Sequence, residues 1–134
     1  LKRAAQTAKI LIKHSTTKLK LDRRLREMSF GAHGGMDQDE HNIIMVPQSA
    51  TGDRMDHKIC EGAESRRDVA TRITEFVEEL MKSDGDKLIV THGFAATFVI
   101  AAFQNVDIAS MGYKSHRYFP STLLHSHPYW ATYL

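Results

Sequence analysis

A histidine follows a short apolar run in the segment Val90-Thr91-His92-Gly93. The run over residues 87–91 is rich in β-branched residues and lies between a polar turn and Gly93, which is the pattern of a buried parallel strand. Sheets of α/β proteins bind ligands at the carboxyl ends of their strands. The glycine lets a ligand approach the backbone, and the expected helix start offers N–H donors to a phosphate. The segment therefore predicts a phosphate site around His92; the alternative is a histidine that only fills a strand end.

Helical patterns surround this segment. Residues 65–82 carry an apolar face, and Ser65 with Asp68 three residues later resembles a capping box. We expect an amphipathic helix over residues 2–14 and a further helix over residues 94–104. Helix, turn, buried strand and helix form an α-β-α unit, so the sequence predicts an α/β fold, a three-layer α-β-α sandwich.

The rest of the chain is less regular. Residues 18–21 alternate charged and apolar side chains as a short strand would, and residues 121–125 and 129–134 are typical of edge strands. Residues 31–63 show weak periodicity, with a short helix near residues 38–46. Long irregular segments of compact domains tend to be lids or binding loops, so we expect this insertion to lie over the site.

Three segments resemble motifs of the histidine phosphatase superfamily, the phosphoglycerate-mutase-like proteins. The first is similar to the family's L-x-R-A-x-Q-T-A helix start and reads Leu1-Lys2-Arg3-Ala4-Ala5-Gln6-Thr7-Ala8. The second is similar to L-R-E-x-x-F-G-x-x-x-G and reads Leu25-Arg26-Glu27-Met28-Ser29-Phe30-Gly31, followed by Gly34-Gly35. The third is similar to G-E-S-x-x-D-x-x-x-R and a later V-(S/T)-H-G, with one inserted alanine, and combines Gly62-Ala63-Glu64-Ser65, Asp68 and Arg72 with Val90-Thr91-His92-Gly93. The order and spacing of all three over residues 1–93 carry the resemblance.

This resemblance implies a phosphoglycerate-mutase-like sandwich and phosphoryl transfer through a phosphohistidine. Arg3 would bind oxygens of the transferred phosphoryl group, because its guanidinium is always charged and bonds phosphate bidentately. His92 would act as a catalytic residue that donates to the same group, with Gly93 as a further substrate-binding residue.

The resemblance also assigns roles to two glutamates. Glu27 would be the second catalytic residue, which protonates the leaving oxygen and later activates water. The alternative for Glu27 is a surface ion pair with Arg24 or Arg26. Glu64 would have a supporting role, through the helix dipole or by orienting neighbouring arginines.

The chain departs from the family pattern because no Arg-His-Gly occurs in it. In the family that segment ends the first strand and carries the nucleophilic histidine. None of the remaining histidines stands in such a motif, namely His14, His33, His41, His57, His116, His125 and His127. We therefore expect the nucleophile and the first strand of the sheet to precede Leu1, and the chain by itself to be inactive.

The complete protein is thus predicted to be a histidine-type phosphatase that hydrolyses a small phosphomonoester without a cofactor. Two alternatives stay open. The absent nucleophile favours a non-catalytic module that binds a phosphorylated ligand or a partner. The basic stretch over residues 13–26 leaves room for a phosphoglycerate-type mutase, which needs a site for an acidic intermediate.

Composition limits the remaining classes. At 134 residues the chain fits one domain, residues 1–134, and its 18 basic and 16 acidic residues are too balanced for a nucleic-acid surface. The single Cys60 excludes an intramolecular disulfide and favours the cytoplasm, and no apolar run approaches the length of a membrane span. We expect a small phosphorylated metabolite or inorganic phosphate as the partner, neither nucleic acid nor membrane, and leave a homodimer open.

One further pair of histidines has metal-ligand spacing. His125 and His127 would point to the same face of a strand, but no further ligands are evident nearby. Surface histidines are the simpler interpretation, and we expect no metal site.

Overall fold

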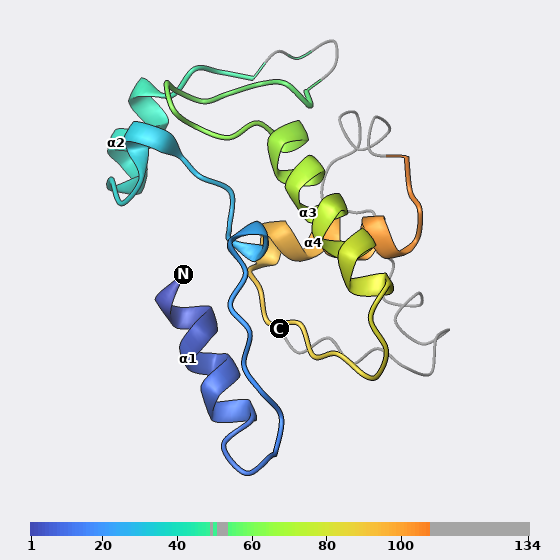
Figure 1. Ribbon diagram of the computed structural model, residues 1–134. Coiled ribbons are helices and arrows are strands. Elements are labelled where there is room, and N and C mark those ends of the chain that lie inside the picture. The colour runs from blue at the N-terminus through green and yellow to red at the C-terminus, as the bar shows by residue number, and fades with distance from the viewer. Residues whose placement is uncertain (49, 51–53, 108–134) are drawn as a thin grey trace.

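The computed structural model describes residues 1–48, 50 and 54–107. In this part of the chain four α-helices and two short 3-10 helices follow one another (Figure 1). In chain order they are α1 (Lys2–Leu11), η1 (Arg23–Leu25), η2 (Gly31–His33), α2 (Gln38–Ile44), α3 (Arg66–Met81) and α4 (Gly93–Phe103). The helices expected from the sequence at these four places are present.

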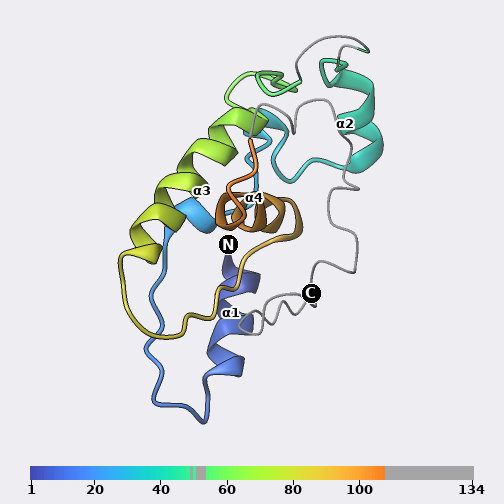
Figure 2. The same cartoon turned by 90° about the vertical axis from the view of Figure 1, so that its right-hand side faces the viewer.

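Helices α3 and α4 form the core. The capping box that starts α3 is complete, because the Ser65 hydroxyl accepts from Asp68 N at 3.1 Å and the Asp68 carboxylate accepts from Ser65 N at 2.9 Å. Figures 1 and 2 show α4 crossing the face of α3. Apolar side chains of both helices are buried where they meet, namely Val69, Ala70, Ile73, Phe76 and Val77 from α3 and Ala95, Phe98, Val99 and Ala101 from α4.

The segment that carries Glu27 is attached to this core. Leu25 and Met28 pack against the buried cluster, and η1 packs on α3. Asp22 caps η1 by accepting from Arg24 N at 2.8 Å. The position of Glu27 is therefore set by apolar contacts on both sides of it in the sequence.

Helix α1 contributes little to the core. Ala8 is its one buried residue, whereas Ile10 and Leu11 are 72% and 49% exposed. Its apolar side instead faces a groove, described below, and its N-terminal end lies beside α4 in both views (Figures 1 and 2).

The prediction of an α/β fold, a three-layer α-β-α sandwich, is wrong for the described residues, which contain helices and no strand. Residues 87–91 and 18–21, where strands were expected, form no backbone hydrogen bond with any other described backbone group. A strand is defined by the ladder it shares with a neighbour, and β-branched composition supplies only a tendency to join one. The apolar run before His92 thus has strand-like composition without a strand partner in this part of the molecule.

The two ends of the expected insertion are joined. Phe30 and Ala63 form an isolated antiparallel bridge, and Ala32 N donates to Glu61 O at 3.4 Å. Gly31 has a φ of +52°, and a Cβ there would come within 2.4 Å of Ala63 N, so only glycine fits this crossing. That residues 31–63 cover the site stays a prediction.

Some expectations concern residues outside the described part. The edge strands at residues 121–125 and 129–134 and the pair His125 and His127 lie there. Within the described ranges no helix combines the length and apolar character needed to cross a membrane. The same ranges hold no group of three or more His, Cys, Asp or Glu side chains placed to bind a metal ion.

Candidate active site

His92 ends the irregular segment before α4 and is the N-cap residue of that helix. Its side chain is buried, with 7% of the residue exposed, and its Nε2 makes no hydrogen bond with any described residue. Burial lowers the pKa of His92, and the nearby charge of Arg3 lowers that pKa further. Because an unpaired buried polar atom costs about 1–3 kcal/mol, the Nε2 atom is suited to a ligand that supplies the missing partner.

Arg3 lies in the first turn of α1 and is exposed. Its side chain makes no hydrogen bond or ion pair with the described residues, yet its charge is close enough to act on His92. The two residues predicted to share one phosphoryl group therefore lie on the same side of the molecule. The charge of the Glu27 carboxylate also acts on His92, and it acts on the pKa of His92 in the opposite direction to the charge of Arg3.

The Glu27 carboxylate sits at the start of α4. It accepts hydrogen bonds from Phe94 N at 3.3 Å, Ala95 N at 3.1 Å and Met28 N at 3.0 Å. The first two donors belong to the first turn of the helix, where negative charge is stabilised by the helix dipole. Glu27 thus occupies helix N–H groups that the sequence analysis had offered to a phosphate.

The alternative interpretation of Glu27 as half of a surface ion pair finds no support in the described residues. Arg24 instead binds Asp22 and Glu79, each at 2.7 Å, and Glu27 has no ion pair with Arg26. The Glu27 carboxylate instead faces the start of α4. Its role as a proton donor stays a prediction.

Gly93 leaves the backbone open beside His92. Its N–H has no hydrogen-bond partner among the described residues, and a Cβ at this position would meet no atom within 4 Å. The open N–H is a donor that a ligand could use, since Glu27 takes the next two N–H groups of the helix.

Glu64 joins the segment around Glu27 to α3. Its carboxylate accepts a bidentate pair of bonds from Arg72 at 2.8 and 3.0 Å, and it also accepts from Ser29 N at 2.8 Å. Arg72 in turn donates to the Arg24 carbonyl at 2.5 Å. Burial alone would raise the pKa of Glu64, but the bonds from Arg72 and Ser29 outweigh it and the pKa is lowered. The geometry shows that Glu64 binds Arg72, and the supporting role of Glu64 in the site stays a prediction.

A second contact holds the same segment. The Thr91 hydroxyl donates to the Leu25 carbonyl at 2.7 Å, directly before His92 in the sequence. Glu27 is therefore tied to the segment of His92 by Thr91 and to α3 by Arg72. The sequence had placed Arg72 and Thr91 within motifs but had given neither a structural role.

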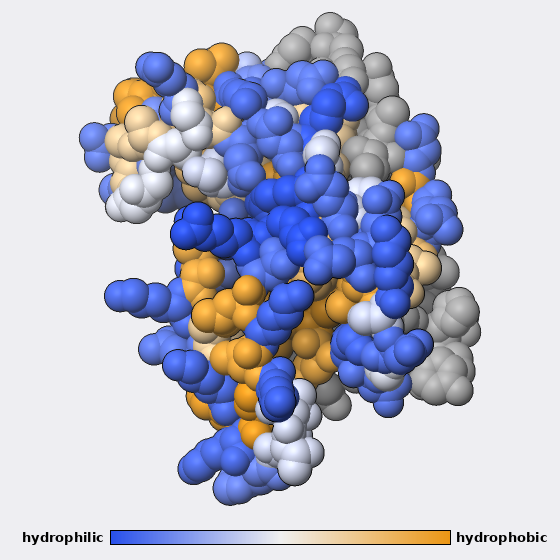
Figure 3. Space-filling model, viewed as in Figure 1, coloured by the Kyte–Doolittle hydropathy of each residue, from blue (hydrophilic) through white to orange (hydrophobic). Residues whose placement is uncertain are grey.

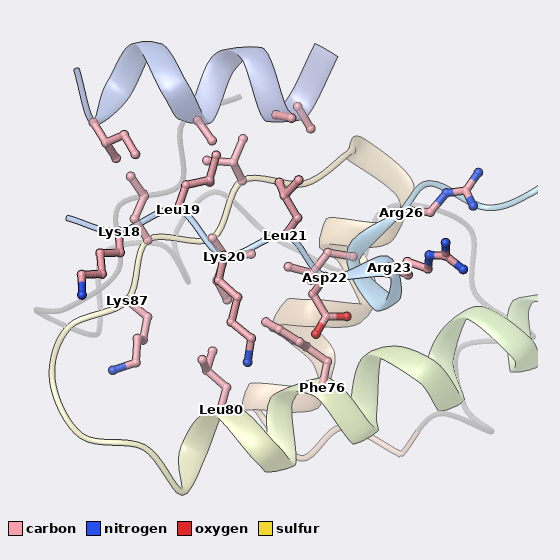
Figure 4. A pocket seen from close by; sticks show the side chains of 18 of the residues that line it. Lys18, Leu19, Lys20, Leu21, Asp22, Arg23, Arg26, Phe76, Leu80 and Lys87 are labelled. Atoms are coloured by element: carbon pink, nitrogen blue, oxygen red, sulfur yellow. The ribbon is translucent and has the colours of Figure 1, made fainter. Parts of the chain in front are cut away.

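A groove of about 830 Å³ leads to His92. Helix α1, residues 17–26, the C-terminal half of α3 and residues 86–92 line it. Figure 4 shows Leu19 and Leu21 pointing towards α1 while Lys20 points away, with Phe76 and Leu80 reaching up from α3. Apolar side chains accordingly gather around α1 on the face seen in Figure 3, beside a hydrophilic surface.

Comparison with known families decides the classification. The family model of the histidine phosphatase superfamily (branch 1) matches residues 1–128, which is nearly the whole chain. The chain belongs to the histidine phosphatase superfamily. Comparisons with curated proteins and with solved structures give no match.

The superfamily includes phosphatases and mutases, which are enzymes of phosphoryl transfer. In this histidine phosphatase homologue the structure brings Glu27, His92 and Gly93 together at the start of α4, with Arg3 close enough to act on His92. Glu64 lies one step away and reaches the site through Ser29 and Arg72. Their roles in a reaction remain predictions.

The Glu64 and Arg72 pair of this histidine phosphatase homologue should be worth more than its surface ion pairs. Replacing Arg72 with alanine leaves a half-buried carboxylate and a carbonyl without their donor, which typically costs about 1–3 kcal/mol. Lys20→Ala is the matched control, because its 3.6 Å pair with Glu79 is exposed and such pairs contribute about 0–1 kcal/mol. Urea unfolding of the full-length protein should show the larger loss for Arg72→Ala. Equal losses in the two variants would remove this role from Arg72.

Proposed function

We propose that the complete protein is a metal-independent phosphatase that hydrolyses a small phosphomonoester through a phosphohistidine. The observation that supports it most is the convergence at the start of α4, where a buried imidazole with an unpaired Nε2, an open N–H and a carboxylate meet under the charge of Arg3. Donors and a positive charge suit a phosphoryl group, and the carboxylate beside them suits proton transfer to its leaving oxygen.

The reaction then has two displacements. A nucleophilic histidine attacks phosphorus, the bond from phosphorus to the ester oxygen breaks, and that oxygen leaves as an alcohol with the proton of Glu27. Water next attacks the phosphohistidine while Glu27 takes its proton, which releases phosphate and restores the histidine. His92 and Arg3 hold the phosphoryl oxygens in both steps. The nucleophile belongs to an Arg-His-Gly segment, and that motif does not occur among these 134 residues.

A second candidate is a phosphate-binding module without catalysis, favoured by the absence of Arg-His-Gly from the sequence. Both candidates would bind inorganic phosphate at the same place. They differ in whether a phosphohistidine forms. A phosphoglycerate-type mutase is the third candidate, which the basic stretch over residues 13–26 leaves open. We place the protein in the cytoplasm on the ground of its one cysteine, Cys60.

Hydrolysis of p-nitrophenyl phosphate by the full-length protein tests this proposal. We expect turnover that is the same with and without a chelator, and an acid-labile phosphoryl-enzyme after rapid quenching, because phosphohistidine is unstable in acid. A fragment limited to these 134 residues should show no turnover. Phosphate binding without any turnover by the full-length protein would favour the non-catalytic module, and a strict metal requirement would contradict the mechanism.

A further inference from the structure

Thr91 stands immediately before His92, at the end of the segment that leads into α4. Its hydroxyl donates to the Leu25 carbonyl at 2.7 Å, and the two residues are 66 positions apart in the sequence. Both are half-buried, so water competes less for this hydrogen bond than for one at the surface. Leu25 precedes Glu27 by two residues. One hydrogen bond therefore joins the two segments that carry the predicted catalytic residues.

The backbone before Glu27 is held at a second carbonyl as well, but by a different part of the molecule. The Arg24 carbonyl accepts a hydrogen bond of 2.5 Å from Arg72, which belongs to α3. The bond from Arg72 thus attaches the segment of Glu27 to the core, whereas the bond from Thr91 attaches it to the start of α4. Of these two bonds, the one from Thr91 relates Glu27 directly to the proposed site.

The position of Glu27 also bears on the imidazole. His92 is the N-cap residue of α4, yet its side chain does not cap the helix. The Glu27 carboxylate caps it instead, because it accepts from Phe94 N at 3.3 Å and Ala95 N at 3.1 Å. The imidazole is not used at the helix end, and its Nε2 has no partner among the described residues. A displacement of the Glu27 segment would therefore alter both the carboxylate and the surroundings of His92.

We propose that Thr91 is a positioning residue, whose hydroxyl holds Glu27 at the place beside His92 from which it protonates the leaving oxygen. This inference rests on the proposed phosphatase function and deepens it. A misplacement of about 1 Å at a reacting group can lower a rate about 100-fold. Thr91 itself is not a ligand of the phosphoryl group, so its loss should impair proton transfer by Glu27 more than binding of phosphate.

Two leaving groups test the inference in the full-length protein. Ethyl phosphate needs a proton on its leaving oxygen, whereas p-nitrophenyl phosphate needs little protonation. For both substrates kcat/KM is measured with the wild type, with Thr91→Val, which has a similar shape without the donor, and with Thr91→Ser, which keeps the donor. Thr71→Val is the matched control, because Thr71 is exposed on α3. Thermal unfolding checks the fold of each variant, and Thr91→Ala replaces Thr91→Val if the latter does not fold.

Thr91→Val should lower kcat/KM about tenfold to a hundredfold for ethyl phosphate, and much less for p-nitrophenyl phosphate. Thr91→Ser and Thr71→Val should stay close to the wild type. Combined with Glu27→Gln, Thr91→Val should cause no further loss with ethyl phosphate, because the proton that it positions is already absent. Equal losses for the two substrates, or a further loss in the double variant, would overturn the inference and leave Thr91 a structural role alone.

Hydrogen exchange separates this inference from the proposed function, since it needs no turnover. The amides of Phe94 and Ala95 donate to Glu27, so they should be protected in the wild type and in Thr91→Ser. They should lose protection in Thr91→Val. Unchanged protection in Thr91→Val would show that the hydroxyl does not place the carboxylate, and would overturn the inference. Absence of hydrolysis by the wild type would contradict the proposed function, while the exchange of these two amides would still decide whether Thr91 positions Glu27.

Discussion

The variant His92→Ala should hydrolyse p-nitrophenyl phosphate about 100 to 1,000 times more slowly than the wild type, as does the loss of one donor to a developing oxyanion. The imidazole is buried and its Nε2 has no partner in the described residues. Its removal should therefore abolish a hydrogen bond to the phosphoryl group and few other interactions. Steady-state kinetics of the full-length protein measure this. His14→Ala is the matched control, since His14 is exposed after the end of α1.

The same variant should change how stability depends on pH. Because the pKa of His92 is lowered in the folded protein, the unfolded chain binds a proton more readily as the pH falls below the ordinary histidine pKa. The imidazole therefore makes folding less favourable in mildly acidic solution, and His92→Ala should lose less stability than the wild type between neutral and mildly acidic pH. Urea unfolding at several pH values measures the difference. Wild-type turnover together with a wild-type pH dependence would remove His92 from the site.

The variant Glu27→Gln should lower turnover by about 100-fold to 10,000-fold, the usual range for loss of a general acid and base. The amide keeps one oxygen for the N–H groups of α4 but cannot donate a proton to the leaving oxygen. The loss should be greater for ethyl phosphate than for p-nitrophenyl phosphate, because nitrophenolate leaves with little protonation. Binding of inorganic phosphate should not weaken, since a negative charge near it has been removed.

Two comparisons keep the Glu27 experiment specific. Glu78→Gln, on the exposed face of α3, should leave turnover at the wild-type level. Thermal unfolding should show that Glu27→Gln remains folded, with a loss of about 0.3–2 kcal/mol for the carboxylate at the start of α4. An equal loss of rate for both leaving groups would mean that Glu27 positions the site and does not transfer a proton.

The local signals in the sequence were sufficient to predict the helices. Ser65 and Asp68 define the start of α3 by their own side chains, and the stripe from Val69 to Val77 defines its buried face. Such signals act within one or two helical turns, so they survive whatever surrounds them.

The sheet could not be predicted in this way, because a strand depends on a partner that its own residues do not specify. Leu19 and Leu21 alternate with Lys20 as a strand requires, and Figure 4 shows that alternation, yet no described backbone pairs with theirs. The alternation predicted which side chains point in the same direction. It could not predict whether the backbone pairs with a neighbouring strand.

The functional pairings were only partly accessible for a similar reason. Glu27 and His92 were identified in separate motifs. The hydrogen bonds from Phe94 N and Ala95 N to the Glu27 carboxylate, however, join residues more than sixty positions apart in the sequence.

The most direct test is a crystal structure of the full-length protein with orthovanadate, which imitates a phosphoryl group in transfer. We expect one vanadate whose oxygens lie about 3 Å from both the Arg3 guanidinium and His92 Nε2, with Glu27 next to an apical oxygen. Vanadate bound elsewhere, or Arg3 and His92 too far apart to touch the same anion, would contradict the shared phosphoryl site.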